Sequence, residues 1–552
     1  MSTSGKTWQL KYERQAGESL WSALMNARAV EDPGAFFSSA SLADLHDPFL
    51  FPDMHRAVDR LQKAIPARER IIVYGDYDVD GISGSALLIH VLRFLGAEVS
   101  YRIPNRLKEG YGLHASYVEE LAKQNAAVLI TVDLGISCAK EVALAQSLNI
   151  DVIITDHHTI PEKLPEAFAI LHPTLAKTYP FPHLSGSGVA FKLACALLTA
   201  THNEDLIPQL TDLASLGTVA DCVPLIGENR TLVKLGLQQL QTTKWDGLRA
   251  ILQNAGNTTF TTDTIGFQIG PRLNASGRMD NAYWGLQTLL ATGPEAYEKS
   301  QKLEALNKDR QDLTKRIMED AEAHLNLSEP LIIEAGVGWS SGIVGLIAGR
   351  LQEKYSKPTF VMEDRGDHLV GSARSLPGFH CVDALKTVAH LLEHFGGHEQ
   401  AAGFHIKKEN YEAFKAELQK NATAHFTKTP LVPSLSADLI LAPDELTLEH
   451  SAKIDSFAPF GVGNPRPLFW LKDITVLETR PVGADGKHLK FKTRMGDQTI
   501  DGIAFNSAAW QADLEQATEL LVHMSAKKWN DKISLEFQLV DCNGGTQNHT
   551  RV

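Results

Sequence analysis

The sequence has few of the features that mark secreted, membrane or zinc-binding proteins. It has five cysteines in 552 residues, an odd number, and no two of them have Cys-x-x-Cys spacing. Disulfides and a zinc knuckle are therefore not expected, whereas a reducing compartment is. No apolar run approaches the ~20 residues of a membrane span, and residues 1–8 do not form the apolar core of a signal peptide. These absences predict a cytoplasmic protein that does not contact a membrane.

Positive charge is also in deficit. The chain has 53 Lys and Arg against 66 Asp and Glu, a formal net charge of −13, which excludes a globally basic protein that coats DNA. Nucleic-acid enzymes are not excluded, because acidic residues that hold cations can account for part of this charge. The basic residues occur in short groups, such as 487–494 and 527–532, and each group is equally compatible with a solvated surface.

Apolar segments and helical segments alternate from about residue 68. This alternation predicts βαβ units and an open parallel sheet, and the length of the chain predicts two to four domains. The expected strands are 71–75, 98–103, 127–132 and 151–155, and the expected helices are 83–95, 115–124 and 138–148.

The rest of the chain divides into segments of different character. Residues 294–327 are rich in Glu, Lys, Leu, Gln and Arg and have no Pro or Gly after Pro294, which predicts one long helix. From about residue 469 short alternating segments separated by turns fit a small barrel of about five strands. The predicted divisions are a helical N-terminal extension (1–50), a catalytic α/β domain (51–293), a connector helix (294–327), a substrate-binding α/β domain (328–428) and an OB-type nucleic-acid-binding barrel (435–546).

Acidic side chains follow the predicted strands where the strands end. Asp76, Asp78 and Asp80 follow the first strand of the alternation, and Asp133 follows the strand at 127–132. In an open parallel sheet, ligands bind at this edge, and Asp76, Asp78 and Asp80 would face one side if their segment stayed extended. The alternative is an Asp-rich turn that caps the next helix, for which one Asp would suffice. Clustered carboxylates repel one another, and bound divalent cations remove that cost.

Asp156, His157 and His158 follow the strand at 151–155. In an extended segment the two imidazoles point to opposite sides, so one can bind a metal while the other faces a substrate. Asp156 could orient a metal-binding imidazole from behind. A single histidine after a strand is more often structural, but two directly after an Asp favour a functional pair. Oxygen ligands with one or two imidazoles favour Mn²⁺ or Mg²⁺ over zinc.

These residues, together with Asp221 in the segment Thr218-Val219-Ala220-Asp221, occur in an order that resembles the DHH phosphoesterase superfamily. Within it, other segments are similar to the RecJ family of single-strand-specific 5′→3′ DNA exonucleases, and the resemblance spans nearly the whole chain. Some superfamily members have a metal-binding histidine where this sequence has Tyr74, so that ligand is either lost or supplied by Asp76. The segments that resemble the RecJ family are 270–279, 338–345, 396–404 and 460–465.

The resemblance implies a metal-dependent exonuclease that degrades single-stranded DNA from 5′ to 3′ to mononucleotides, in DNA repair and recombination. It implies that His158 lies beside the scissile phosphate, with Asp156 as the second catalytic residue. Its implied partner is single-stranded DNA, with a single-strand-binding protein and a helicase as further candidates, and the chain is expected to be a monomer. The implied ligands of two Mn²⁺ or Mg²⁺ ions are Asp76, Asp78, Asp80, Asp133, His157 and Asp221.

Other residues have side chains suited to holding the phosphates and bases of a DNA strand. Three of them, Arg272, Asn274 and Arg278, lie within residues 270–279, where Pro and Gly predict a loop. Guanidinium groups match phosphate geometry, a Tyr offers a stacking face for a base, and Gly396-Gly397 lets backbone N–H groups approach a phosphate. The alternative for the glycine pair is a tight turn between a strand and a helix. The expected DNA-binding residues are Arg106, Tyr111, Arg272, Asn274, Arg278, Ser341, Ser372, Arg374, Gly397 and His398.

Two other functions compete with the exonuclease. One is a DHH phosphodiesterase of short oligonucleotides or cyclic dinucleotides, or a pyrophosphatase, but such enzymes do not need the additional barrel. The other is a DNA-binding scaffold with a degraded site, against which the full set of acidic and histidine residues argues.

Overall fold

The computed structural model describes residues 2–106, 109–110, 112–256, 259–530 and 532–543. The chain forms two compact units. The smaller unit combines Met1–Ser39, Leu431–Phe460 and Asn464–Val552, and the larger unit combines Ala40–Pro430 with Gly461–Gly463.

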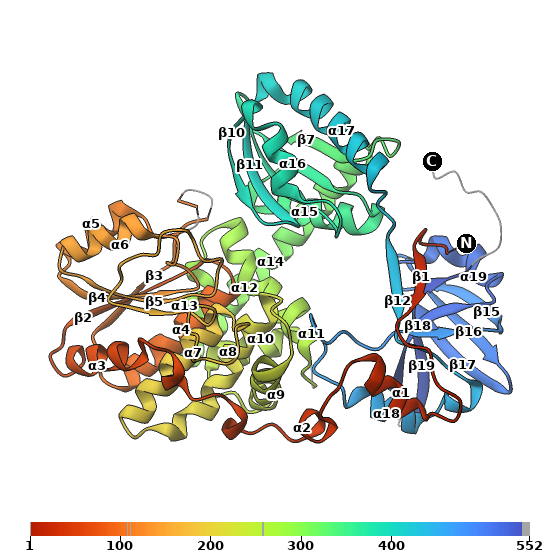
Figure 1. Ribbon diagram of the computed structural model, residues 1–552, viewed down its shortest axis with the longest axis horizontal. Coiled ribbons are helices and arrows are strands. Elements are labelled where there is room, and N and C mark those ends of the chain that lie inside the picture. Colours follow the sequence, from red (N-terminus) through yellow and green to blue (C-terminus); the bar gives the residue numbers. More distant parts are fainter. Residues whose placement is uncertain (1, 107–108, 111, 257–258, 531, 544–552) are drawn as a thin grey trace. The chain divides into compact units, whose positions relative to one another are not determined.

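A five-stranded parallel sheet forms the first part of the larger unit (Figure 1). The strands β2, β3, β4 and β5 alternate in sequence with helices, as predicted, whereas β6 follows β5 without a helix between them. Strands β2, β4 and β5 are neighbours in the sheet. Helices α3, α4 and α7 pack on one face of the sheet, and α5 and α6 pack on the other. In sheet order the strands are β3 (Val99–Arg102), β2 (Arg70–Gly75), β4 (Ala126–Val132), β5 (Asp151–Thr155) and β6 (Ala169–Leu171). The helices are α3 (Met54–Ala64), α4 (Val79–Phe94), α5 (Ala115–Lys123), α6 (Ala139–Ser147) and α7 (Gly186–Ala200).

A run of helices follows the parallel sheet. The last of them is the predicted long helix, which begins at Gly293 and ends at Glu322. It packs against α10, α12 and α13 and also against α15. The run comprises α8 (Ile207–Ala220), α9 (Gly227–Leu240), α10 (Asp246–Ala255), α11 (Thr262–Thr264), the π-helix η4 (Ile265–Ile269), α12 (Gly270–Met279), α13 (Tyr283–Leu290) and α14 (Gly293–Glu322).

Helix α12 corrects one expectation, because residues 270–279 were predicted as a loop marked by Pro and Gly. Pro271 lies in the first turn of the helix, where its missing N–H is not needed. Gly277 serves close packing, since a Cβ there would lie 3.2 Å from the carbonyl oxygen of Tyr77. Proline at a helix start and glycine at a packing contact look like turn signals in the sequence.

The second α/β part of the larger unit has a five-stranded sheet of mixed direction. Only β7 and β8 are parallel, and the other neighbours are antiparallel. Short connections join β8 to β9 and β10 to β11, and such hairpins force antiparallel pairing. Helix α15 packs on β8 and β9, and the other face packs on α16 and α17. The elements are β10 (Leu392–Gly397), β11 (Ala401–Lys407), β9 (His368–Arg374), β8 (Thr359–Asp364), β7 (Ile332–Val337), α15 (Ser341–Tyr355), α16 (Cys381–Thr387) and α17 (Tyr411–Lys428).

The smaller unit contains a seven-stranded sheet in the region where about five strands were expected. Most of the N-terminal segment predicted as a helical extension (1–50), up to Ser39, belongs to this unit. It contributes strand β1 (Thr7–Leu10), which pairs in parallel with β12 (Ser434–Ala437). In sheet order the strands are β13 (Leu439–Ile440), β14 (Phe469–Leu471), β18 (Leu520–Trp529), β19 (Lys532–Cys542), β17 (Gln498–Ala504), β16 (His488–Met495) and β15 (Ile474–Val482).

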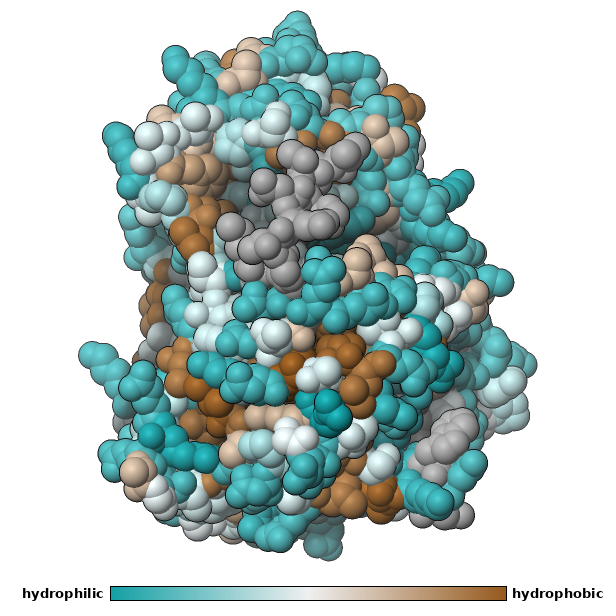
Figure 2. Space-filling view, turned by 90° about the vertical axis from the view of Figure 1, so that its right-hand side faces the viewer, coloured by the Kyte–Doolittle hydropathy of each residue, from teal (hydrophilic) through white to brown (hydrophobic). Residues whose placement is uncertain are grey.

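The surface mixes hydrophilic and hydrophobic residues. On the face drawn in Figure 2 the hydrophobic residues form separate patches. Among the described residues, no helix has the length and apolar character that crossing a membrane requires.

Candidate metal centre and phosphate-binding residues

Three neighbouring strands deliver the first candidate residues to one edge of the parallel sheet. Gly75, Val132 and Thr155, at the ends of β2, β4 and β5, are register partners. Asp76, Asp133 and Asp156 are the next residues in each case, so the strand ends bring these three carboxylates to the same edge, as predicted.

Asp78 and Asp80 reach the same place by a different route from the one expected. The segment does not stay extended, because α4 begins at Val79. Asp78 is the N-cap of α4, and its Oδ1 accepts hydrogen bonds from the backbone N–H groups of Asp80 (2.9 Å) and Gly81 (3.2 Å). Asp80 lies in the first turn and accepts from the N–H groups of Gly186 (2.6 Å) and Ser187 (2.9 Å) at the start of α7. The tight turn from strand to helix, rather than strand alternation, brings these carboxylates together.

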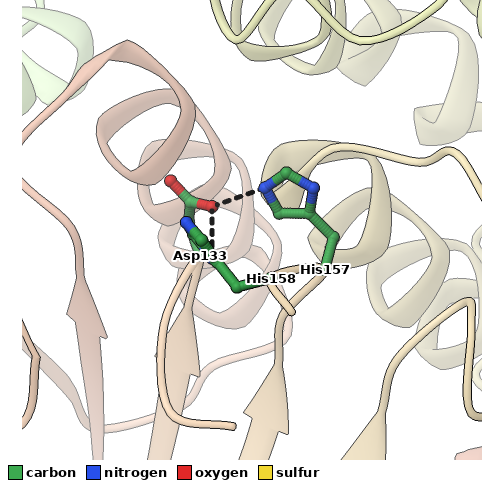
Figure 3. Close-up of side chains that lie close together, drawn as sticks. All are labelled: Asp133, His157 and His158. Atoms are coloured by element: carbon green, nitrogen blue, oxygen red, sulfur yellow. Dashed lines mark ion pairs between the residues drawn. The ribbon is translucent and has the colours of Figure 1, made fainter. Parts of the chain in front are cut away.

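The imidazole of His157 faces three carboxylates from three different segments. Its Nε2 lies 3.2 Å from Asp133 Oδ1, 3.5 Å from Asp221 Oδ2 and 3.8 Å from Asp80 Oδ2. Figure 3 shows the carboxylate of Asp133 between the imidazoles of His157 and His158. Asp221 is the C-cap of α8, 65 positions after Asp156 in the numbering, and only folding brings it here.

Asp156 lies behind this group and orients His158. Its carboxylate accepts hydrogen bonds from His158 Nδ1 (2.7 Å) and from the backbone N–H groups of His157 (2.8 Å), His158 (3.2 Å) and Ile136 (2.9 Å). Burial alone would raise the pKa of Asp156, but these hydrogen bonds lower it below its ordinary value. Burial lowers the pKa of His158, but the bond to Asp156 outweighs this and raises it to about 9. His158 therefore carries a proton near neutral pH.

We call Asp76, Asp78, Asp80, Asp133, His157 and Asp221 the acid–histidine cluster. Burial and then repulsion from neighbouring carboxylates raise the pKa of Asp76, Asp78 and Asp133, and raise that of Asp221 to about 8. Burial lowers the pKa of His157. The cluster therefore resists carrying its full negative charge without a compensating cation.

The donor atoms of the acid–histidine cluster fit divalent cations. Three groups of three residues each have ligand atoms that lie within 4.8 Å of one another. Asp133 belongs to two of these groups, and so does His157. Among the described residues, Asp76 Oδ1 and His157 Nε2 are buried without a hydrogen-bond partner. Buried polar atoms of this kind need a partner, and carboxylate oxygens with an imidazole suit Mn²⁺ or Mg²⁺. The three groups are Asp133–His157–His158, Asp80–His157–Asp221 and Asp76–Asp78–Asp133.

Tyr74 does not replace the histidine of other superfamily members. It is buried, its hydroxyl donates to the carbonyl oxygen of Gly112 (3.1 Å), and it packs in the core that contains α5 and α6. Asp76, two residues later, belongs to a group of candidate ligands with Asp78 and Asp133. The geometry favours Asp76 as the substitute ligand.

Three of the predicted phosphate-binding residues form what we call the arginine cluster: Arg106, Arg278 and Arg374. Burial, and then the nearby positive charges of Arg106, Arg310 and Arg374, lower the pKa of Arg278 to about 9. Burial and Arg106 also lower the pKa of Arg374. Arg278 Nη1 donates to the carbonyl oxygen of Gly342 (3.1 Å), and Arg374 Nη1 donates to Ser372 Oγ (3.0 Å). Grouped cations of this kind suit an anionic ligand.

Arg272 has a different environment from Arg278, although both lie on α12. Its Nε and Nη2 donate to the carboxylate of Glu304 on α14 (2.6 and 3.3 Å), and its Nη1 donates to the carbonyl oxygen of Gln268 (2.9 Å). These partners favour a structural role for Arg272. Asn274 is half-buried on the same helix.

Apart from Tyr111, the remaining predicted DNA-binding residues lie in the second α/β part. Gly397 has φ +142° and a Cβ there would lie 2.3 Å from the carbonyl oxygen of Ala401, so the hairpin itself requires glycine. The N–H of His398 donates to that same carbonyl (2.7 Å), and the His398 side chain is exposed. The backbone therefore makes a tight turn here, but the turn joins the strands β10 and β11 rather than a strand and a helix. Ser341 Oγ accepts from Arg365 (2.9 Å). Tyr111 lies outside the described residues.

The segment that holds Asp80 was not predicted from the sequence. Gly186 and Ser187 donate to both oxygens of its carboxylate, and a Cβ on Gly186 would lie 2.5 Å from Asp133 Oδ1. The signal was present as Ser185-Gly186-Ser187-Gly188, small residues at a helix start, where backbone N–H groups bind carboxylates. Arg310, buried on α14 near Arg278, had no signal apart from its charge.

The fold and the acid–histidine cluster agree with three family descriptions that match the sequence. "DHH family, N-terminal domain" matches residues 70–218, "DHHA1 domain" matches 328–424 and "RecJ OB domain" matches 437–541. A parallel α/β domain with these residues at its carboxyl edge, followed by a DHHA1 domain, defines a DHH phosphoesterase.

Relatives narrow this class. The chain is 34% identical over 518 residues to the single-stranded-DNA-specific exonuclease RecJ of Escherichia coli (strain K12), covering 88% of this chain and 89% of that protein. It is 35% identical over 511 residues to RecJ of Bacillus subtilis (strain 168), of whose length it spans 64%. A crystal structure of RecJ in complex with Mn²⁺ from Thermus thermophilus matches with a TM-score of 0.82 and 29% identity, covering 98% of this chain and 80% of that one. The chain belongs to the RecJ family.

Proposed function

We propose that the protein is a metal-dependent exonuclease that degrades single-stranded DNA from 5′ to 3′, releases mononucleotides and acts in DNA repair and recombination. The observation that carries this proposal is the acid–histidine cluster in the same unit as the arginine cluster. The first suits cations and the second suits phosphates, which are the two partners of phosphodiester hydrolysis. The relatives named as single-stranded-DNA-specific exonucleases support the substrate and the reaction.

The residues of the acid–histidine cluster would hold two Mn²⁺ or Mg²⁺ ions. Such ions, when bound, lower the pKa of a water nucleophile and stabilise the attacking and leaving oxygens of the phosphodiester. Asp80 is held in place by two backbone N–H groups and Asp78 by the helix start, so the ligand positions are set before a metal binds. This preorganisation keeps the carboxylates from turning away from one another.

His158 would contact the scissile phosphate. Its Nδ1 bonds to Asp156, which leaves Nε2 as the nitrogen that can donate to a phosphate oxygen. In the metal-free protein the bond to Asp156 raises the pKa of His158 to about 9, and a protonated imidazole at this position would stabilise negative charge on that phosphate. Asp156 has a positioning role, since it holds the ring and keeps it protonated.

The arginine cluster supports the direction of digestion. If Arg374 and Ser372 bind a terminal 5′-phosphate, the next phosphodiester lies at a fixed distance from the metal ions, and digestion begins at the 5′ end. The barrel of the smaller unit would hold the strand further along by stacking and by charge. A protein of this kind has single-stranded DNA as its partner. We further propose that a single-strand-binding protein and a helicase act with it and that it is a cytoplasmic monomer.

One assay tests the function. Single-stranded oligonucleotides labelled separately at each end, and a blunt duplex, are incubated with the protein and Mn²⁺. We expect mononucleotide release from the 5′ end, no attack on the duplex, and a reduced preference for 5′-phosphate over 5′-hydroxyl ends in Arg374→Ala. Equal cleavage from both ends, or efficient attack on the duplex, would contradict the proposal and favour a phosphodiesterase of short oligonucleotides.

A further inference from the structure

One face of the sheet of the second α/β part is partly uncovered. Strands β9, β11 and β10 are neighbours, and on this face Ser372, Gly403 and Gly396 are register partners in one row across the three strands. Helix α15 packs against β8 and β9, while Gly403 and Gly396 on the outer two strands are exposed. The opposite side chains of β11, Ala402, Phe404 and Ile406, are buried.

Gly396 and Gly403 are glycines that the fold does not require. Neither has a left-handed φ angle. Among the described residues, a Cβ on Gly396 would meet no atom within 4 Å, and one on Gly403 would meet only the carbonyl oxygen of Gly371 at 4.0 Å. Gly371 shows the contrast in the same sheet, because a Cβ there would lie 2.2 Å from the ring of Phe404. Glycine weakens a strand, so two facing glycines with free space above them indicate that something else uses that space.

Polar groups border this glycine floor (Gly396 and Gly403) on two sides. In the next row on one side, Arg374 pairs with Ala401, so Arg374 and Ser372 lie together beside the floor. In the next row on the other side, His394 pairs with His405, and their ring centroids are 4.0 Å apart. Successive rows on this face therefore carry Arg374 with Ser372, which suit an anion, then the glycine floor, and then the two imidazoles.

We propose that the glycine floor binds the base of the 5′-terminal nucleotide, whose phosphate lies on Ser372 and Arg374 and whose base edge contacts the imidazole pair. This inference rests on the proposed function and extends it, because it assigns a base-binding subsite to Gly396, Gly403, His394 and His405. A flat ring can lie on exposed peptide planes only where no Cβ stands between them. On the other side of the glycine floor lie the imidazoles of His394 and His405, and such rings stack on bases of every kind.

The sharpest test fills the floor without disturbing the fold. Gly403→Val adds a β-branched side chain, which strands favour. Apart from its chain neighbours, the nearest described atom to its Cβ would be the carbonyl oxygen of Gly371 at 4.0 Å. We expect KM for 5′-phosphorylated single strands to rise about 10-fold, within the range for losing one stacked base, with kcat little changed. The same comparison uses an oligonucleotide whose 5′-terminal residue is abasic. Wild type and Gly403→Val should have the same KM for this substrate, because it has no base for the valine to displace.

Controls separate the possible outcomes. Gly349→Ala changes a glycine of α15 that also has no atom within 4 Å of an added Cβ, and it should leave KM unchanged. His405→Ala should weaken binding of the normal end more than that of the abasic end. An equal KM rise for both ends in Gly403→Val would overturn the proposal, since the floor would then serve the sugar–phosphate chain. Anisotropy of both oligonucleotides in EDTA measures binding without hydrolysis, so a failure of the proposed exonuclease function remains distinguishable.

Discussion

The larger unit contains two clusters of like charge. One is negative and the other positive, but in both the charged groups lie close enough to shift one another's pKa. The acid–histidine cluster places buried carboxylates close enough to raise one another's pKa, and the arginine cluster places guanidinium groups close enough to lower the pKa of Arg278. Gathering like charges in a buried place costs free energy. Each cluster therefore points to a ligand of opposite charge, cations for one and phosphates for the other.

A third buried charged group in the same unit shows what a purely structural arrangement looks like. Lys192 and Glu228 are both buried and form an ion pair, and the hydroxyl of Tyr179 donates to the same carboxylate. Here the protein supplies both signs of charge, and no further ligand is needed. An excess of one sign of charge, rather than burial of charge alone, therefore distinguishes the acid–histidine and arginine clusters from this ion pair.

The largest expected effect comes from removing a ligand from the acid–histidine cluster. Asp133→Ala or His157→Ala should lower hydrolysis on the order of 1000-fold, as when a principal electrostatic contribution to catalysis is lost. Mn²⁺ binding, measured by electron paramagnetic resonance, should fall, while single-strand binding persists through the arginines. Asp205→Ala, at an exposed position, is the control. Near-normal turnover of either variant at saturating Mn²⁺ would show that the acid–histidine cluster does not hold the catalytic metal ions.

Asp156→Asn should have the next largest effect, about 10- to 100-fold on kcat, the usual range for a residue that orients a ligand. Because the folded protein raises the pKa of His158 to about 9, its proton is held below that pH and lost above it. In the variant this loss should occur at lower pH. A pH profile of kcat that keeps its alkaline limb unchanged would refute the positioning role.

The two arginines of α12 provide a matched pair within the second cluster. Arg278→Ala should weaken single-strand binding about 10-fold and lower the salt slope of log affinity by roughly 0.7, the value for one lost phosphate contact. Arg272→Ala should leave the slope unchanged and lower thermal stability slightly, because its partner is Glu304. Salt titrations of both variants check this, and the reverse pattern would show that Arg272 is the phosphate ligand.

The smallest effect concerns the stability of the metal-free protein. Asp76, Asp133 and Asp221 have folded pKa values above their unfolded ones, so the folded state binds more protons between about pH 4 and 8. Stability is therefore greatest at the acid end of this window and falls as the pH rises. The melting temperature in EDTA should drop by a few degrees from pH 5 to 8, and Mn²⁺ should restore it most at pH 8. A metal-free melting temperature that rises across this range would contradict the assigned pKa directions.

Much of the fold could be predicted because it depends on local pattern. The apolar runs that become β2, β4 and β5 are continuous, and parallel pairing puts their carboxyl ends at one edge whatever else the chain does. The long helix α14 was visible for the same reason, as a stretch with high helix propensity. The prediction of a loop at 270–279 was wrong. Proline and glycine occur both in turns and in helices, at the first turn or at close packing contacts, and the residue types alone do not distinguish these roles.

The amino-acid sequence was sufficient to predict the parallel sheet, the residues at its edge and, through the resemblance, the connection of Asp221 to them. Which of these residues contact one another became clear only in the folded chain, because contacts such as His157 with Asp221 depend on how helices pack rather than on spacing. It also separated Arg272 from Arg278 by giving one a carboxylate partner and the other a cluster of like charges. The same holds for the glycines, since φ and the space around a missing Cβ exist only once strands have paired.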